Sequence, residues 1–393
     1  MANVTAQFQQ YTVLLAQYRP YWHLLPFRCK DLPWQDAELA EQLQQLDEPA
    51  LAALEQDPLR QQQFFRRFFP ALFDLPQLAQ AELNTLSAVP FWLETGIGGR
   101  KLQQIDALCQ QWLAGRLPVI EWCAGKGHLG RILSQRFKQA VTSVEWQPQL
   151  CDEGTELAKK HQLPQTFICA DVLTAPLTTV LKPQQHLVAL HACGQLHIRL
   201  IEQAVAAECQ QLQLVPCCYH LIPTSSYQPL SDFALQHDLV LTRDDLKLVV
   251  QGQATGGERI SRLRHSEVLW RLAYDELRAD MSGEPEYKPL QSIAKHWFSG
   301  EFASFAAWAA QQHGISLPVS IDWQSYLARA AERHLLVRRI ELVRHLFRRP
   351  LEIWLALDKA MFLQQQGYQV RLTQLCKPEI TPRNILISAV KKA

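Results

Sequence analysis

Hydrophobic and polar positions change their rhythm near residue 117. From there onward, short apolar runs alternate with amphipathic segments of helical spacing. The apolar runs predict buried parallel strands, and they cover residues 119–123, 141–145, 166–170, 186–191 and 212–217. Segments such as 149–161 and 196–208 have the spacing of the connecting helices. This alternation predicts a doubly wound α/β sheet.

The pattern changes again after Pro223 and regains sheet character near the end of the sequence. Residues 246–250 form a possible strand, and helical spacing then continues to about Arg349. An amphipathic helix is expected over residues 351–366, followed by strands over residues 368–375 and 384–390. The last helix and strand pair would complete a seven-stranded Rossmann-like sheet, with the region before them inserted into it.

Residues 1–115 have mainly helical spacing. An aromatic stripe here is more typical of a core than of a ligand platform, and it comprises Phe64, Phe65, Phe68, Phe69, Leu72 and Phe73. We therefore expect four regions. These are a helical N-terminal domain (1–97), the Rossmann-like core (98–223), a mostly helical insertion (224–349) and a C-terminal completion of the sheet (350–393).

Composition narrows the class of protein. With 393 residues, 48% of them hydrophobic, the chain can bury a large core, and its net charge of +1 gives no global preference for nucleic acid or membrane. Ten cysteines are scattered along the chain, and several lie in predicted strands, which favours a reducing environment over a disulfide framework. Since no signal core or membrane-spanning run is found, we expect a cytoplasmic location and no membrane partner.

Candidate chemistry centres on the stretch from Val119 to Gly130. A strand, a glycine-punctuated turn and a helix start follow one another here, so backbone N–H groups can face a ligand. Gly125, Gly127 and Gly130 satisfy G-x-G-x-x-G, a pattern that a dinucleotide site also shows.

Acidic residues at the ends of three strands favour a different cofactor. In a doubly wound sheet, Glu121, Glu145 and Asp171 would line one crevice. Glu145 is placed to accept from ribose hydroxyls, Asp171 from an adenine amino group, and Glu121 to lie near an amino-acid ammonium. This set fits S-adenosylmethionine better than NAD, although strand-end acids that only cap the following helices remain an alternative.

Four sequence blocks resemble those of class I S-adenosylmethionine-dependent methyltransferases. The blocks are Glu-Trp-Cys-Ala-Gly-Lys-Gly-His-Leu-Gly (121–130), Leu-His-Ala-Cys-Gly (190–194), Pro-Cys-Cys-Tyr-His (216–220) and Thr-Pro-Arg-Asn-Ile-Leu-Ile (381–387). The most similar group is the methyltransferase-like proteins related to the methyltransferase part of the glutathione S-transferase C-terminal-domain-containing protein. The resemblance covers roughly residues 98–223 and 350–390.

The resemblance implies S-adenosylmethionine as cofactor. It implies binding at the glycine turn and the acids, and the residues expected at the cofactor are Lys101, Glu121, Cys123, Ala124, Gly125, Gly127, Glu145, Trp146, Asp171, Val172 and His191. Lys101 matches a basic position that lies near the cofactor in similar proteins, where it could pair with the methionine carboxylate. A solvated lysine at a helix start is an equally good interpretation.

The ends of strands four and five supply the candidate catalytic residues His191, Cys217, Tyr219 and His220. His191 could take a proton from an attacking atom. Three interpretations of the cysteines stay open: buried small hydrophobes, a zinc site of Cys193, Cys217, Cys218 and His220, and a Cys217 nucleophile. The first is favoured, and a four-ligand site would require the chain to leave strand geometry by Cys218.

Residues 329–349 form a basic run on a predicted amphipathic helix. Its arginines could contact an RNA backbone, and those singled out are Arg329, Arg333, Arg338, Arg344 and Arg348. A solvated helix face paired with acidic neighbours is at least as good an explanation.

The sequence therefore predicts an S-adenosylmethionine-dependent methyltransferase with a macromolecular acceptor. RNA (tRNA or rRNA) is favoured, and protein is a close second. The alternatives are an NAD-dependent oxidoreductase and a catalytically inactive protein that keeps the methyltransferase fold.

Overall fold

The computed structural model describes residues 4–392, except residues 82, 176, 178, 238 and 252–257. The chain divides into two compact units. Unit 1 comprises Met1–Gln17, Leu75–Val250 and Arg348–Ala393, and unit 2 comprises Tyr18–Asp74 and Gln251–Phe347. The regions 1–97 and 224–349, which were expected to form separate domains, are each shared between the two units.

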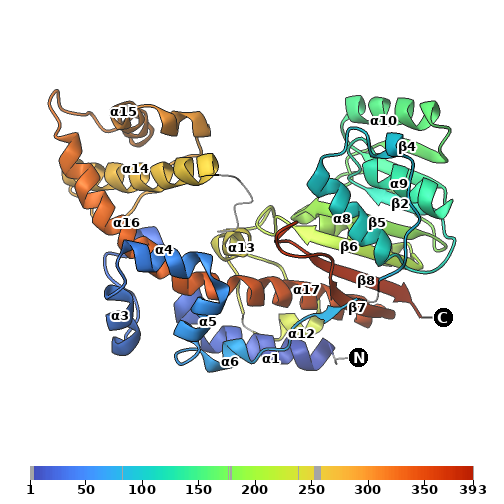
Figure 1. Cartoon of the computed structure of the whole chain (residues 1–393), viewed down its shortest axis with the longest axis horizontal. Helices are drawn as coiled ribbons and strands as arrows, with labels where there is room; N and C mark the ends of the chain where they lie inside the picture. Colours follow the sequence, from blue (N-terminus) through green and yellow to red (C-terminus); the bar gives the residue numbers. More distant parts are fainter. Residues whose placement is uncertain are drawn as a thin grey trace. The chain divides into compact units, whose positions relative to one another are not determined.

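Unit 1 contains one mixed sheet with helices packed on it (Figure 1). Its strands are β1 (Ala79–Gln80), β2 (Val119–Trp122), β3 (Val141–Glu145), β4 (Gln165–Cys169), β5 (His186–Cys193), β6 (Gln211–Cys217), β7 (Tyr368–Gln374) and β8 (Ile385–Lys391). Its helices are α1 (Val4–Gln17), α7 (Phe91–Glu94), α8 (Gly99–Gln110), α9 (His128–Phe137), α10 (Pro148–Lys160), α11 (Gln195–Ala206), α12 (Asp232–Leu235), α13 (Arg243–Val250) and α17 (Arg348–Gln365).

The strand order is β1-β7-β8-β6-β5-β2-β3-β4. Strands β2 to β6 pair in parallel with one another, whereas β8 runs antiparallel to both β6 and β7. The seven predicted strands of the sheet are β2 to β8, which confirms the predicted fold class. The additional two-residue strand β1 pairs with β7 at the edge.

The prediction of a strand at residues 246–250 was wrong, because these residues belong to helix α13 (Arg243–Val250). The Thr242 hydroxyl accepts a hydrogen bond from the Asp245 backbone N–H (3.3 Å), and the Asp245 carboxylate accepts one from the Thr242 N–H (2.7 Å). This reciprocal capping box starts a helix, and the branched apolar residues that resemble a strand then pack on its inner face.

Strand β2 lies at the point where the winding of the sheet reverses. It pairs with β3 on one side and with β5 on the other. Right-handed crossovers in the two directions place their helices on opposite faces, so the loops after β2 and β5 diverge at their carboxyl ends. Ligands of such sheets bind at this carboxyl edge, which is where the glycine turn and His191 lie.

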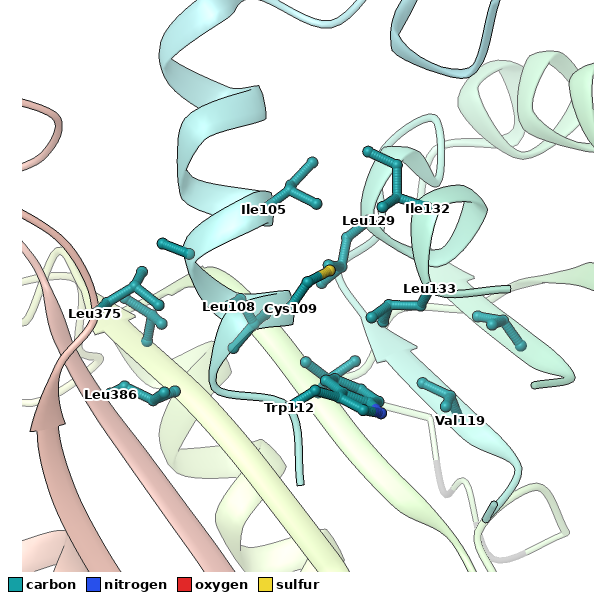
Figure 2. Close-up of a cluster of buried hydrophobic side chains, with 14 of the residues drawn as sticks. Ile105, Leu108, Cys109, Trp112, Val119, Leu129, Ile132, Leu133, Leu375 and Leu386 are labelled. Atoms are coloured by element: carbon teal, nitrogen blue, oxygen red, sulfur yellow. The ribbon is translucent and has the colours of Figure 1, made fainter. Parts of the chain in front are cut away.

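Helices α8 and α9 cover one face of the sheet. Figure 2 shows side chains of α8, including Ile105 and Leu108, close to Leu129 and Leu133 of α9 and to Val119 of β2. All five side chains are at least 97% buried. This packing fixes the start of α9, and therefore the glycine turn before it, against the sheet.

Helix α17 is buried along most of its length and contacts α1, α11, β7 and β8. Its Asp358 is fully buried and accepts hydrogen bonds from Tyr227, Leu230 and Ser231. A buried carboxylate is stable only when its oxygens are satisfied in this way, so Asp358 anchors the segment after β6 to α17.

Unit 2 is helical. Its helices are α2 (Arg19–Trp22), η1 (Pro26–Arg28), α3 (Ala37–Gln44), α4 (Glu48–Gln56), α5 (Pro58–Phe65), α6 (Pro70–Phe73), α14 (Glu258–Ser282), η2 (Lys295–Ser299), α15 (Phe302–His313) and α16 (Trp323–Leu346). Phe65, Phe69 and Leu72 of the aromatic stripe are buried, as expected for a core. In neither unit is there a helix, among the residues described, with the length and apolar character needed to cross a membrane.

Candidate cofactor and acceptor site

The turn after β2 has a left-handed backbone at three positions. Cys123, Gly125 and Gly127 have φ angles of 54°, 59° and 66°. A Cβ atom on Gly125 would meet no described atom within 4 Å, whereas one on Gly127 would lie 2.5 Å from the Phe167 ring. Gly125 therefore borders open space, as a ligand cradle requires, while Gly127 lets the turn pack closely on the sheet. Ala124, between them, is buried.

Glu145 joins the end of β3 to the glycine turn. One of its carboxylate oxygens accepts the Gly125 N–H (2.8 Å), and the other accepts the Gln147 N–H (3.1 Å). A carboxylate oxygen has two acceptor sites, so each retains one for a further donor such as a ribose hydroxyl. The neighbouring Trp146 has 65% of its surface exposed and offers an apolar face at the same edge.

Asp171 follows β4 and caps the next turn. Its carboxylate accepts the Leu173 N–H (3.0 Å) and the Thr174 hydroxyl (3.3 Å), and the residue is exposed. The capping interpretation therefore describes part of what Asp171 does, and the exposed carboxylate still has sites for a ligand donor. Val172 is buried beneath this turn.

Glu121 is buried beneath the start of α9. Its carboxylate is 97% buried, accepts the Ser143 hydroxyl (2.6 Å) and lies against the first turn of α9 at Gly130. Burial raises the pKa of Glu121 to about 7, although the Ser143 hydroxyl and the N–H groups of Gly130 and Leu129 oppose the rise. The residue thus holds α9 to the sheet, because strand alternation turns it toward α9. Its contact with an amino-acid ammonium stays a prediction.

Lys101, in the first turns of α8, is exposed. Burial lowers the pKa values of His128 and His191, and the positive charge of Lys101 lowers them further. The same charge opposes the rise that burial causes in the pKa of Glu121. These residues lie at the ends of β2 and β5 and the start of α9. Lys101 therefore brings a cation to the carboxyl edge, and its pairing with a methionine carboxylate stays a prediction.

His191 lies at the end of β5, where the strand pairing is irregular, and has a φ of 65°. Its Nε2 is 2.7 Å from the Gln104 amide oxygen, so Nε2 carries the ring proton and Nδ1 is left as an acceptor. Burial, followed by the charge of Arg383, lowers the pKa of His191 to about 4. The ring is therefore neutral at physiological pH, and it is better suited to accept a hydrogen bond than to hold a full proton.

Three cysteines gather beside His191. The Cys193 sulfur lies 3.1 Å from that of Cys217 and 3.4 Å from that of Cys218. The pKa of the Cys217 thiol is raised, first by its sulfur neighbours and then by burial. A buried, protonated thiol is a poor nucleophile, so this geometry disfavours covalent catalysis by Cys217.

Tyr219 and His220 diverge after β6. Tyr219 is 98% buried between the His197 ring and the Lys359 ammonium, and burial raises its pKa well above 10. This placement differs from the predicted one in the acceptor pocket, because Tyr219 points into the packing beneath α17. His220 is half-buried, and its Nδ1 has no hydrogen-bond partner within the described part of the chain.

Two residues at this edge were missed from the sequence as site residues. Gln104 binds His191 from α8, and the charge of Arg383, which precedes β8, lowers the pKa values of His191 and Cys218. Arg383 lies inside the resemblance block 381–387, which was the available signal. Helical periodicity places Gln104 on the inner face of α8, but it does not predict that Gln104 contacts His191.

Most arginines of the predicted RNA-binding stripe are engaged inside unit 2. Arg329 pairs with Glu276 and Asp280, Arg333 with Asp275 and Glu276, Arg338 with Glu48 and Glu55, and Arg344 with Glu341 and the Trp22 carbonyl. The run also spans two helices, since α16 ends at Leu346 and Arg348 starts α17 in unit 1. The paired helix face weighed as an alternative is therefore the one that the geometry supports.

Residues 100–225 match the sequence model of a family described as a methyltransferase domain. The match includes strands β2 to β6 and the candidate cofactor and catalytic residues from Lys101 to His220, but neither Arg383 nor the arginines of the predicted RNA-binding stripe. Residues 100–225 therefore form a region that matches a methyltransferase domain.

The chain is also similar to parts of several solved structures. One is a SAM dependent methyltransferase from Aquifex aeolicus, with 14% identity over 33% of this chain and 72% of that chain and a TM-score of 0.25. Another is Aeropyrum pernix fibrillarin with natively bound S-adenosyl-L-methionine, with 12% identity over 29% and 52% of the two chains and a TM-score of 0.25. A third comes from work on the conversion of a disulfide bond into a thioacetal group during echinomycin biosynthesis (22% identity, 28% and 48% of the two chains, TM-score 0.24). This chain thus spans only about half of the last two proteins.

Proposed function

We propose that this protein transfers a methyl group from S-adenosylmethionine to a macromolecule, with RNA (tRNA or rRNA) as the favoured acceptor and protein as the second. The observation that carries the proposal is the pairing of Gly125 with Glu145 at the switch point of the sheet. Gly125 leaves open space above its backbone, and Glu145 presents two partly used carboxylate oxygens beside it. Together they form a cradle that fits an amino-acid tail joined to a ribose.

Other residues at the carboxyl edge of the sheet would supply the remaining contacts to the cofactor. Trp146 and Val172 would enclose the adenine ring, and Asp171 would accept from its amino group. Lys101 would pair with the methionine carboxylate, since it is exposed and its charge reaches the start of α9. The bound cofactor supplies an electrophilic methyl group on a sulfonium.

The acceptor would enter between the ends of β5 and β6. His191 would orient it through Nδ1, because Gln104 fixes the ring and its proton. With a pKa of about 4, His191 is a weak base at neutral pH, so the proton of the acceptor would pass to solvent. Positioning of the acceptor in line with the methyl group is then the main contribution of the protein.

RNA is placed before protein because of the local charge. Besides burial, Arg383 lowers the pKa of His191, so a cation other than Lys101 lies where the acceptor would be held. This positive charge favours a phosphodiester backbone over a neutral peptide. The arginines of α16 do not enter this argument, since most of them are paired within unit 2.

The test uses tritiated S-adenosylmethionine and a lysate of cells that lack the protein. RNA and protein fractions are counted separately after incubation with the wild type, Arg383→Gln and Arg371→Gln. We expect label in RNA, a loss of about tenfold with Arg383→Gln, corresponding to about 1.4 kcal/mol, and no loss with Arg371→Gln on β7. Label confined to protein would overturn the choice of RNA.

Calorimetry with the purified protein separates failure of the substrate assignment from failure of the activity. We expect binding of S-adenosylmethionine and none of NAD. Tight NAD binding would indicate an oxidoreductase. Cofactor binding without transfer to either fraction would indicate an inactive member of the fold and would overturn the proposed enzyme.

A further inference from the structure

Three sulfur atoms converge where β5 and β6 end. The Sγ atoms of Cys193, Cys217 and Cys218 all lie within 4.8 Å of one another. Cys217 is buried, whereas Cys193 and Cys218 are half-buried, so the cluster lies at the margin of the core. It lies beside His191, at the carboxyl ends of β5 and β6.

Two departures from regular strand geometry bring these sulfurs together. The pairing of β5 with β6 shifts between Leu190 and Cys193, which puts Cys193 directly opposite Cys217. Cys218 then adopts a left-handed backbone with a φ of 47°. Adjacent side chains on a strand point to opposite faces, so this turn is what allows Cys217 and Cys218 to reach the same point. A non-glycine residue held in this conformation costs about 1–3 kcal/mol, which suggests that the site is functional.

We propose that Cys193, Cys217 and Cys218 bind one Zn²⁺ ion as three thiolate ligands. Soft thiolates prefer zinc over harder cations, and sites with three protein ligands are common for this metal. With Zn–S bonds of about 2.3 Å, tetrahedral ligands lie about 3.8 Å apart. The observed separations of 3.1 and 3.4 Å would therefore need to open by about 0.7 and 0.4 Å to reach this spacing.

The charges around the cluster suit a bound cation with thiolate ligands. Three thiolates around Zn²⁺ carry a net charge of −1, which the nearby Arg383 guanidinium would balance. Zinc binding displaces the thiol protons, so the affinity should rise with pH.

The coordination number distinguishes this site from the four-ligand alternative. Among the residues that the structure describes, no fourth Cys, His, Asp or Glu atom joins the group of three sulfurs. His220, two residues after Cys218, is not part of that group. The fourth position is thus left to water or another exogenous ligand, as in zinc sites that take part in chemistry.

A disulfide would explain the cluster less completely. It would join two of the sulfurs and leave the third without a role, although Cys193 contacts both Cys217 and Cys218. Packing of thiols as small hydrophobes does not explain why two of the three are half-buried beside an arginine.

The test measures metal in tag-free protein purified without chelator. Elemental analysis should find about one zinc per chain, and Co²⁺ substitution should give intense thiolate-to-cobalt charge-transfer absorption. Cys193→Ser and Cys218→Ser should each lose zinc affinity about tenfold or more. Cys29→Ser is the matched control, because Cys29 is also half-buried but lies in unit 2. His220→Gln should retain the metal.

Several outcomes would overturn the proposal. They are wild-type protein without zinc, a Co²⁺ spectrum without thiolate bands, or two thiols lost to a disulfide in the protein as purified. Equal zinc loss from His220→Gln would overturn the three-ligand set. Circular dichroism of each variant guards against unfolding, and an unchanged fold with lost metal is the expected result. None of these measurements depends on methyl transfer, so the zinc site can fail while the proposed activity stands.

Discussion

Replacement of Gly125 by valine tests the cofactor cradle directly. The Gly125 backbone has a φ of 59°, and a Cβ atom there would meet no atom of the described residues within 4 Å. The fold should therefore survive, at a cost of about 1–2 kcal/mol for a left-handed non-glycine residue. This is small beside the 5–15 kcal/mol by which typical domains are stable.

The effect on cofactor binding should be much larger. A side chain at this turn would occupy the space assigned to the methionine part of S-adenosylmethionine. Adding atoms to a packed site costs about 1–3 kcal/mol, or roughly 5- to 150-fold in Kd. We expect the Kd of a Gly125→Ala variant to rise by a factor in this range. Valine is larger and β-branched, so binding should be lost.

Titration calorimetry with S-adenosylmethionine, together with thermal unfolding, checks both parts. Gly314→Val is the control, because Gly314 has a φ of 66° and similarly lacks close neighbours for a Cβ among the described atoms, but it lies in unit 2. It should lose similar stability and bind normally. Gly125→Val with wild-type affinity would refute the placement of the cofactor.

Three further predictions concern carboxylates. Glu145→Gln should weaken S-adenosylmethionine binding about 10- to 100-fold by calorimetry, since hydrogen bonds to a charged group contribute about 1.5–3 kcal/mol. The exposed Glu156→Gln on α10 should not, and equal affinities of the two variants would remove Glu145 from the site. Burial raises the pKa of Glu121 from 4.5 to about 7. The folded state therefore holds this proton more tightly than the unfolded chain, and wild-type stability should fall as the pH rises through that interval. Urea unfolding should show that Glu121→Gln lacks this fall of about 3 kcal/mol, and parallel pH profiles would contradict the assignment. Asp358→Ala should lower the free energy of unfolding in urea by about 3–5 kcal/mol, because buried donors such as the Tyr227 hydroxyl would lose their acceptor. Asp358→Asn should lower it less. A loss below 1 kcal/mol for Asp358→Ala would contradict the anchoring role.

The strands could be predicted because burial on both faces of a parallel sheet demands continuous apolar runs. The same criterion misassigned residues 246–250, where Thr242 and Asp245 already carried a capping-box signal. The alternation of side chains along β2 also predicts that Glu121 points toward α9. It lies two residues after Val119, whose side chain belongs to the cluster beneath α9.

Long-range pairing is the part that the sequence could not supply. Arg338 pairs with Glu48, which lies 290 positions earlier in the chain. Helical periodicity predicts which face an arginine occupies, but not which distant carboxylate meets it. The convergence of Cys193, Cys217 and Cys218 likewise depends on a register shift and a left-handed residue, neither of which a strand pattern encodes.

The position of β8 has a consequence for biosynthesis. Until β8 inserts between β6 and β7, the backbone N–H and C=O groups along one edge of β6 remain unpaired in the nascent protein. All residues of β6 are buried in the folded protein. Premature termination before residue 385 would therefore split the sheet internally instead of trimming its margin, and the product should aggregate or be degraded.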